Sequence, residues 1–308
     1  MSAASSAGGA GPRHVWVDGE LRPADGPHLS AFDRGFQLGD GIFETLRARG
    51  GRLTELAEHA ARLARSAGGL GIELPAGVEG LLARGIAEVL AAEGLDRADG
   101  DASVRVTVSR GAWRSRGLLP GRDERLTATI VIQAWPVLPP PADHLERGLA
   151  LVASSVRRDP QNPIVTLKTT SRADYVYARL EARRAGADDA LFLTISGHCS
   201  EATTANVFLV RRAADGVIEL ATPSLECAIL PGTTRSWLLR WASGAGLRPV
   251  ESWLLPADLA AADEAFMCSS VAGVLPITRF DGAPIGAGVP GPWTLRARAD
   301  RERFIVEG

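Results

Sequence analysis

The sequence is almost devoid of lysine: Lys168 is the single one among 34 lysine and arginine residues. Cysteine is also scarce. Cys199, Cys227 and Cys268 are odd in number and widely spaced, and the five histidines are scattered, so neither a disulfide framework nor a zinc site is indicated. The sequence has no run of 18 apolar residues, and its start, MSAASSAGGAGPRH, lacks the basic and apolar blocks of a signal peptide. We therefore expect a cytoplasmic protein, not a membrane protein, with a flexible tail over residues 1–13.

An excess of charge of either sign is missing too. The 308 residues are 45% hydrophobic and carry a formal net charge of −2, and the mean hydropathy is close to zero. This length suffices for one large or two ordinary domains, each with its own core. No basic stripe of the kind that binds nucleic acid is apparent, and no internal repeat is visible. These properties favour a globular protein whose partner is a small molecule.

The rarity of lysine directs attention to Lys168. Wherever this chain needs a plain positive charge it uses arginine, so a lysine that persists has a property that arginine lacks. Arginine stays protonated above pH 12, whereas a lysine amine can lose its proton and attack a carbonyl to form a Schiff base. This chemistry points to an aldehyde cofactor or a ketone substrate. The alternative is a leftover surface lysine, and only its neighbourhood can decide between the two.

The first half of the chain predicts hairpins, helices and strands. Asp18-Gly19 and Gly50-Gly51 are typical hairpin turns, within residues 15–22 and 41–56. Apolar residues at helical spacing predict two helices, and apolar and β-branched runs predict two further strands. The helices are expected over 53–72 and 78–95, and the strands over 102–110 and 126–135.

Pro139 to Pro141 interrupt this pattern and are too stiff for either type of element. We therefore predict a small N-terminal α/β domain over 14–136, a linker over 137–146 and a larger C-terminal domain over 147–308. The elements expected in the second domain are a strand over 149–158, a helix over 172–186, two strands around a turn within 189–212, a strand over 216–222, a helix over 233–246, strands over 247–255 and 264–270, and a helix from about Trp293. This mixture indicates an α/β protein, with Lys168 near the domain boundary, where clefts form.

Several motifs now combine into a pattern that resembles one family. They occur in this order: FDRGFQLGDGIFETLR, HAARLARS, LKTTSRADYVYARLEARRAGADDALFL, SEATTANVFLV, ILPGTTR and MCSSVAGVLPI. Together they span about residues 14–285 and resemble the class IV aminotransferases. That family includes D-amino-acid and branched-chain aminotransferases and 4-amino-4-deoxychorismate lyase. The resemblance implies the two-domain fold of type IV enzymes that use pyridoxal 5′-phosphate, with the cofactor in the interdomain cleft, and it implies a homodimer.

The same resemblance assigns the centre of the site. It makes Lys168 the residue that forms the internal aldimine with pyridoxal phosphate and then carries a proton between the substrate Cα and the cofactor. Glu201 matches the carboxylate beside the pyridine nitrogen, although alone it would be interpreted as a solvated turn residue. Asn206 is expected to support the turn beneath Glu201. Family members often place a tyrosine against the cofactor's 3′-oxygen near the lysine, but here positions 172 and 173 are arginine and alanine.

Two stretches could bind the cofactor phosphate. In PGTTR a glycine turn opens a helix, so backbone N–H groups and hydroxyls at Thr233 and Thr234 can face an anion. The family uses the arginine of HAARL, Arg62, as a phosphate partner, and it has a second hydroxyl-bearing loop at Ser269 and Ser270. The alternatives are an ordinary helix cap for the first stretch and a surface charge for the arginine.

The sequence also offers candidates for binding the substrate. A substrate carboxylate needs a cation, and the candidates are Arg47, Arg114 and Arg116. Tyr175 and Tyr177 are expected to pack the helix after the lysine. The first hypothesis is an aminotransferase that moves an amino group between an amino acid or primary amine and a 2-oxo acid. The alternatives are 4-amino-4-deoxychorismate lyase, which releases pyruvate and 4-aminobenzoate, and a catalytically inactive protein that binds the cofactor, because one electron-accepting cofactor serves several reactions.

Overall fold

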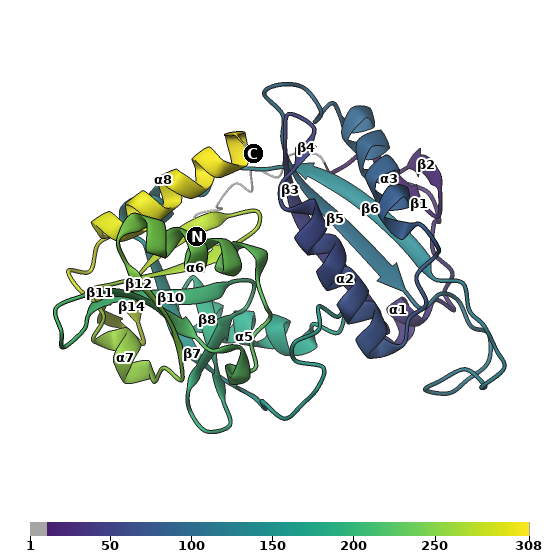
Figure 1. Cartoon of the computed structure of the whole chain (residues 1–308). Helices are drawn as coiled ribbons and strands as arrows, with labels where there is room; N and C mark the ends of the chain where they lie inside the picture. The colour runs from purple at the N-terminus through teal and green to yellow at the C-terminus, as the bar shows by residue number, and fades with distance from the viewer. Residues whose placement is uncertain (1–10, 308) are drawn as a thin grey trace, which may run out of the picture. The chain divides into compact units, whose positions relative to one another are not determined.

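A computed structural model describes residues 11–307, so residues 1–10 of the predicted tail lie outside the described residues. The chain divides into two compact units, Met1–Val137 and Leu138–Gly308, which we call the N-terminal and the C-terminal unit and describe separately (Figure 1). Both contain strands and helices, which the sequence predicted.

The N-terminal unit contains a sheet of six strands among its described residues, in the order β2-β1-β6-β5-β3-β4 with antiparallel pairing. Every second residue of β5 from Ala102 to Val108 is buried, which is the alternation expected of a strand with one face on a core. The predicted hairpins are confirmed. Asp18 and Gly19 both have positive φ, as the tight turn between β1 and β2 requires. The strands are β1 His14–Val17, β2 Glu20–Pro23, β3 Gly41–Arg49, β4 Arg52–Leu53, β5 Asp101–Ser109 and β6 Thr129–Pro136.

In the part of this unit that the structure describes, three helices accompany the sheet: α1 Arg34–Leu38, α2 Leu56–Leu70 and α3 Val78–Glu93. The predicted helices correspond to α2 and α3, which pack on the sheet and share its apolar core. Gly85 lets α3 approach closely, because a Cβ there would lie only 2.7 Å from Ile132 and 2.8 Å from Trp16. The N-terminal unit therefore has a helical layer on one sheet.

The C-terminal unit contains a sheet of nine strands among its described residues, in the order β12-β11-β10-β13-β14-β7-β8-β9, with β15 paired to β14. Three pairs are parallel, namely β7 with β8, β7 with β14, and β11 with β12. The prediction of two strands within 189–212 was wrong, because β8, β9 and β10 form there, and β14 was not predicted. The strands are β7 Leu149–Arg158, β8 Asp189–Thr194, β9 Cys199–Ala202, β10 Asn206–Arg212, β11 Ile218–Pro223, β12 Arg248–Ser252, β13 Glu264–Ser269, β14 Gly273–Phe280 and β15 Ala283–Pro284.

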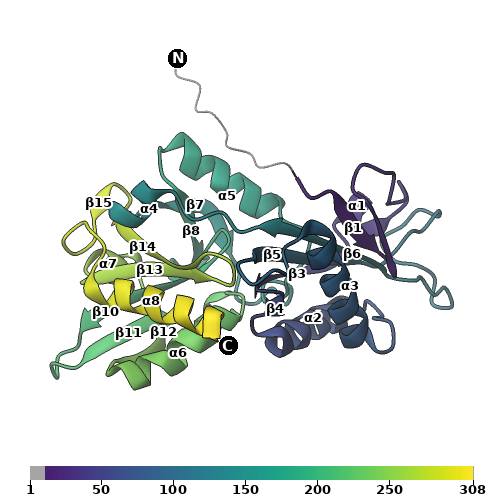
Figure 2. The same ribbon diagram turned by 90° about the horizontal axis from the view of Figure 1, so that it is seen from above.

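Helices cover both faces of this sheet (Figure 2). On one face α6 and α8 pack against β10, β11, β13 and β14, and on the other α5 packs on β7 and β8. The helix α4 occupies part of the predicted linker. The helices are α4 Ala142–Glu146, α5 Ala173–Arg184, α6 Thr233–Ala245, α7 Pro256–Ala260 and α8 Pro292–Glu307. Among the described residues, none of the helices has the length and apolar character needed to cross a bilayer.

Candidate active site

Lys168 lies in the segment that joins β7 to α5, and its side chain is partly buried. The backbone N–H of Leu167 donates to the Ile164 carbonyl at 3.0 Å, so the chain turns just before the lysine. The Val165 carbonyl accepts a hydrogen bond at 3.1 Å from Nη2 of Arg158, a buried side chain at the end of β7. A buried guanidinium therefore anchors the backbone three residues before Lys168.

Glu201 is buried on β9, and three donors surround its carboxylate. The backbone N–H of Leu230 donates to Oε2 at 2.9 Å, and Asn206 Nδ2 reaches the same oxygen at 3.4 Å. Arg158 Nη2 donates to Oε1 at 3.2 Å. A buried carboxylate is tolerated only when it is paired and hydrogen-bonded in this way. The predicted supporting role of Asn206 is consistent with its second hydrogen bond, at 3.0 Å, to the Leu230 carbonyl.

Arg158, which contacts both the lysine segment and Glu201, was not predicted from the sequence. Burial tends to lower the pKa of its guanidinium, but the charge of Glu201 and the contact with Tyr175 outweigh this and raise it. Burial also raises the pKa of Tyr175, with a further contribution from Glu201, so its hydroxyl stays protonated. Arg158 Nη1 donates to that hydroxyl, which gives Tyr175 a polar contact beyond the helix packing predicted for it. The arginine pair that ends strand 149–158, ten positions before Lys168, was the signal available in the sequence.

The start of α6, by which we mean Gly232 and the first turn of the helix, brings the predicted hydroxyl groups together. Thr233 and Thr234 are buried, and Thr233 Oγ1 lies 3.2 Å from Oγ of Ser270. Gly232 caps the helix without a side-chain hydrogen bond, and the first turn has no acidic residue. A Cβ at Gly232 would lie 2.1 Å from Oδ1 of Asn206, so only glycine fits beside that amide. This helix start is therefore adjacent to the Glu201 carboxylate through Asn206.

Ser269 and Ser270 lie at the turn from β13 to β14 and are partly buried. Ser269 pairs with Gly273 across the two strands, and its hydroxyl accepts from the N–H of Ala272 at 3.3 Å. Of the two, Ser270 contacts α6 through Thr233. The C-terminal unit thus contains Glu201, the hydroxyls of α6 and the serine loop in one connected region.

Arg62 is buried on α2 in the N-terminal unit, where it forms a two-point ion pair with Glu44 of β3. Its Nε and Nη2 lie 2.8 and 2.7 Å from the two carboxylate oxygens, and His59 Nδ1 lies 2.7 Å from Oε2. Burial alone would raise the pKa of Glu44, but the hydrogen bonds from Arg62 and His59 lower it to about 2. The pair fixes the orientation of the Arg62 guanidinium, and its predicted role as a phosphate partner stays a prediction.

The three arginines predicted to bind substrate have different surroundings. Arg47 is buried on β3, and its Nε and Nη2 lie 2.8 and 2.7 Å from the two oxygens of Asp101 on β5. Arg114 and Arg116 are exposed in the segment that follows β5. The Arg114 guanidinium lies 5.4 Å from the ring centroid of Phe32. A structural ion pair therefore holds Arg47, whereas the other two guanidiniums face solvent.

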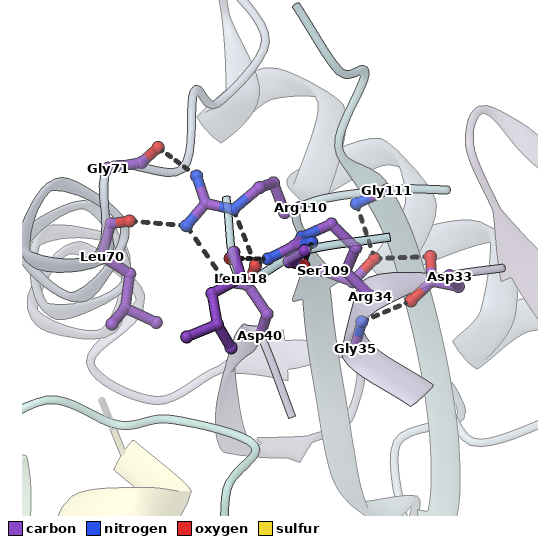
Figure 3. Close-up of polar contacts among 11 residues, drawn as sticks. Asp33, Arg34, Gly35, Asp40, Leu70, Gly71, Ser109, Arg110, Gly111 and Leu118 are labelled. Carbon is purple, nitrogen blue, oxygen red and sulfur yellow. Dashed lines mark hydrogen bonds and ion pairs between the residues drawn. The ribbon is translucent and has the colours of Figure 1, made fainter. Parts of the chain in front are cut away.

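A polar cluster around Asp40 holds the segment that carries Arg114 and Arg116 (Figure 3). Buried Arg34 donates from Nε to Asp40 at 2.8 Å, and from Nη1 and Nη2 to the carbonyls of Gly117 and Leu118. Burial raises the pKa of the Asp40 carboxyl, but hydrogen bonds from Arg110 and Arg34 lower it further than burial raises it. The ionised carboxylate thus fixes Arg34, and Arg34 fixes the loop backbone next to Arg116.

The beginning of the same segment is held by Asp33 and Ser109 (Figure 3). Ser109 Oγ donates to Asp33 at 2.7 Å and accepts from the N–H of Gly111 at 3.0 Å. Gly111 has a φ of +98°, and a Cβ there would lie 2.0 Å from the Thr127 carbonyl, so glycine is required. The loop with the two exposed arginines is therefore anchored on both sides.

These features suit pyridoxal phosphate. Its phosphate needs a helix start free of acidic residues and rich in N–H and hydroxyl donors, and its ring nitrogen needs a buried carboxylate. The C-terminal unit has both, together with the chain's lysine. Among residues 11–307, no group of three or more histidine, cysteine or acidic side chains could hold a metal ion.

The family model "Amino-transferase class IV" matches residues 41–280. The chain belongs to the class IV aminotransferases. It is a pyridoxal-phosphate-dependent transaminase whose substrates are amino acids and 2-oxo acids, and the predicted family, fold class, cofactor and enzyme class are confirmed.

Two relatives and one solved structure illustrate the similarity. The D-alanine aminotransferase of Bacillus licheniformis is 30% identical, over 95% of this chain and 97% of that protein. The branched-chain-amino-acid aminotransferase of Pseudomonas aeruginosa is 31% identical, over 91% and 89%. The crystal structure of the branched-chain aminotransferase of Thermoproteus uzoniensis with norvaline is 28% identical, with a TM-score of 0.83 over 96% of this chain and 95% of that one.

Proposed function

We propose that this enzyme transfers the amino group of an aliphatic α-amino acid to a 2-oxo acid, with Lys168 as the catalytic lysine. The observation that carries the proposal is the contact set of Arg158, whose one guanidinium binds both the backbone before Lys168 and the Glu201 carboxylate. It holds the backbone that leads to Lys168 and the Glu201 carboxylate at fixed positions in one unit. Pyridoxal phosphate, when bound, supplies an aldehyde that bonds to amines and a ring that accepts electrons.

In this proposal Lys168 Nζ takes the Cα proton of the amino acid and later returns it, since a lysine amine can act as a base once it is neutral. Glu201 would pair with the ring nitrogen and favour its protonated form, and Asn206 and the Leu230 N–H keep the carboxylate oriented. The hydrogen bond from Arg158 prevents the carboxylate from turning away.

The phosphate is proposed to bind at the start of α6. Thr233 and Thr234 provide backbone N–H groups and hydroxyls there, and the Thr233–Ser270 contact supports a contribution from the loop of Ser269 and Ser270. Arg62 is proposed as the charged partner. Its support is the HAARL motif, by which the chain resembles the family whose model matches it.

For the substrate carboxylate we propose Arg114 and Arg116 rather than Arg47. The ion pair with Asp101 occupies two nitrogens of Arg47. The exposed pair is on a loop that Arg34 and Ser109 anchor, so their backbone is preorganised while their side chains can reach a ligand. An aliphatic donor is supported by the names of the two relatives, which act on D-alanine and on branched-chain amino acids.

We further propose a cytoplasmic homodimer with domains 14–136 and 147–308 joined by the linker 137–146. Cysteines that are buried and kept as thiols are typical of a reducing compartment. The N-terminal unit exposes large apolar side chains, with Phe36, Leu118 and Leu119 at 77%, 81% and 70%. Exposed apolar groups of this size favour a protein interface, and the oligomeric state in solution tests this.

A donor screen tests the proposed function. The purified chain is mixed with pyridoxal phosphate and 2-oxoglutarate or pyruvate, and D-alanine, L-leucine, L-valine and (R)-1-phenylethylamine are compared as donors. We expect turnover with at least one aliphatic amino acid and little with the amine, which has no carboxylate for Arg114 or Arg116. Turnover of the amine alone, or release of pyruvate and 4-aminobenzoate from 4-amino-4-deoxychorismate without transamination, would overturn the proposal.

A further inference from the structure

A completely buried arginine lies behind the start of α6. Arg301 of α8 is 0% exposed, and its Nη2 lies 3.3 Å from Oγ1 of Thr234. Its guanidinium carbon is 5.2 Å from the ring centroid of Trp237 on α6 and 5.1 Å from that of Phe304 on α8. The two helices lie next to one another on one face of the sheet (Figure 2). Aromatic rings of both helices therefore hold this cation at the N-terminal turn of α6.

The position is electrostatically unusual. A helix N-terminus carries a partial positive charge, so a cation there is unfavourable and an anion is favourable. The first turn of α6 has no acidic residue and no capping side chain. A second buried arginine, Arg235, is in this turn and pairs with the Glu251 carboxylate 2.6 Å away. The Arg301 guanidinium lies at the same helix end, where the partial positive charge of the helix favours a bound anion.

The contact between Arg301 and Thr234 also determines which way the hydroxyl hydrogen of Thr234 points. A guanidinium has only hydrogen-bond donors, so the Thr234 oxygen must be the acceptor from Arg301. The hydroxyl hydrogen then points away from Arg301 and can be donated to another acceptor. Arg301 therefore orients the Thr234 hydroxyl as a donor at the same helix end to which it adds charge.

We propose that Arg301 is a positioning residue of the phosphate site, which raises affinity for the phosphate dianion through the Thr234 hydroxyl and through its own charge. This inference rests on the proposed function, because that function puts the cofactor phosphate at the start of α6. It requires no contact between Arg301 and the phosphate. The aromatic contacts of Trp237 and Phe304 hold the guanidinium in place and leave its charge intact.

The test uses the full chain freed of cofactor and three probes: pyridoxal phosphate, pyridoxal, which lacks the phosphate, and inorganic phosphate. We expect Arg301→Met to weaken pyridoxal phosphate binding about tenfold and to change pyridoxal binding by less than about twofold. It should also abolish most of the increase in melting temperature that inorganic phosphate gives the parent. Arg301→Lys should retain part of the affinity. Arg303→Gln is the matched control, because Arg303 is exposed on the same helix and pairs with Asp300.

A double-mutant cycle with Thr234→Val separates this role from simple packing. If Arg301 acts through the hydroxyl, its replacement costs less affinity when the hydroxyl is already gone. If Arg301→Met does not fold, the cycle is made with Arg301→Lys. Three results would overturn this inference but not the proposed function. They are an equal loss of affinity for pyridoxal and pyridoxal phosphate, fully additive effects of the Arg301 and Thr234 substitutions on affinity, and an unchanged affinity for pyridoxal phosphate. A parent that binds no pyridoxal phosphate would instead overturn the proposed function, and this inference with it.

Discussion

Replacing Glu44 with glutamine tests how strongly the buried pair with Arg62 stabilises the N-terminal unit. Burial raises the pKa of the Glu44 carboxyl, but hydrogen bonds from Arg62 and His59 lower it from 4.5 to about 2. A pKa difference of about 2.5 corresponds to about 3 kcal/mol of unfolding free energy at pH 7. An amide cannot supply this charge, so we expect Glu44→Gln to lower the free energy of unfolding by about 3 kcal/mol at pH 7.

The pH dependence makes this prediction specific. Because the folded-state pKa is the lower one, the stabilisation is complete above about pH 4.5 and is lost as the pH falls towards about 2. Glutamine does not titrate, so the difference between parent and variant should shrink by about 1 kcal/mol from pH 7 to pH 4. Urea unfolding at both pH values measures this difference in the free energy of unfolding. The control is Glu58→Gln on the exposed side of α2, which should lower the free energy of unfolding by less than about 0.5 kcal/mol. A difference at pH 7 below about 1 kcal/mol, or one that does not shrink at pH 4, would refute the reasoning.

Four further variants test the site. Lys168→Arg keeps the charge but has no amine for the cofactor aldehyde, so we expect a folded protein without visible cofactor absorbance and with less than about one thousandth of parental turnover; turnover near the parental rate would remove Lys168 from the chemistry. Glu201→Gln should retain the cofactor but slow Cα proton exchange about a hundredfold, measured by deuterium washout, because an amide cannot keep the ring nitrogen protonated; an unchanged rate would contradict this. Arg114→Gln with Arg116→Gln should raise KM for the amino acid about tenfold at unchanged melting temperature. Arg47→Gln should mainly lower the melting temperature. If Arg47→Gln instead raised KM at an unchanged melting temperature, and the double variant left KM unchanged, Arg47 would be the substrate ligand.

The sequence by itself determined the features that depend on local patterns. Helical spacing of apolar residues predicted α2 and α3, and the Gly turns predicted the hairpins, because backbone conformation and one-sided burial are properties of short segments. The scarcity of lysine indicated Lys168 before any motif was considered, since it is a matter of amine chemistry and composition. The strand β14 was missed because Pro276 lies within it, and proline argues against a sheet interior when only the sequence is known.

Only the tertiary structure decided which charges meet. Arg47, Arg62 and the exposed Arg114 all look alike in a sequence with 33 arginines, yet the first two form buried two-point ion pairs and the third faces solvent. The partners of Arg47 and Arg62 lie 54 and 18 residues away along the chain, and the packing of strands and helices brings them together. The same holds for Arg158, which joins Glu201 to the lysine segment, and for the buried Arg301. A guanidinium's environment depends on long-range packing, so composition and spacing could not reveal it.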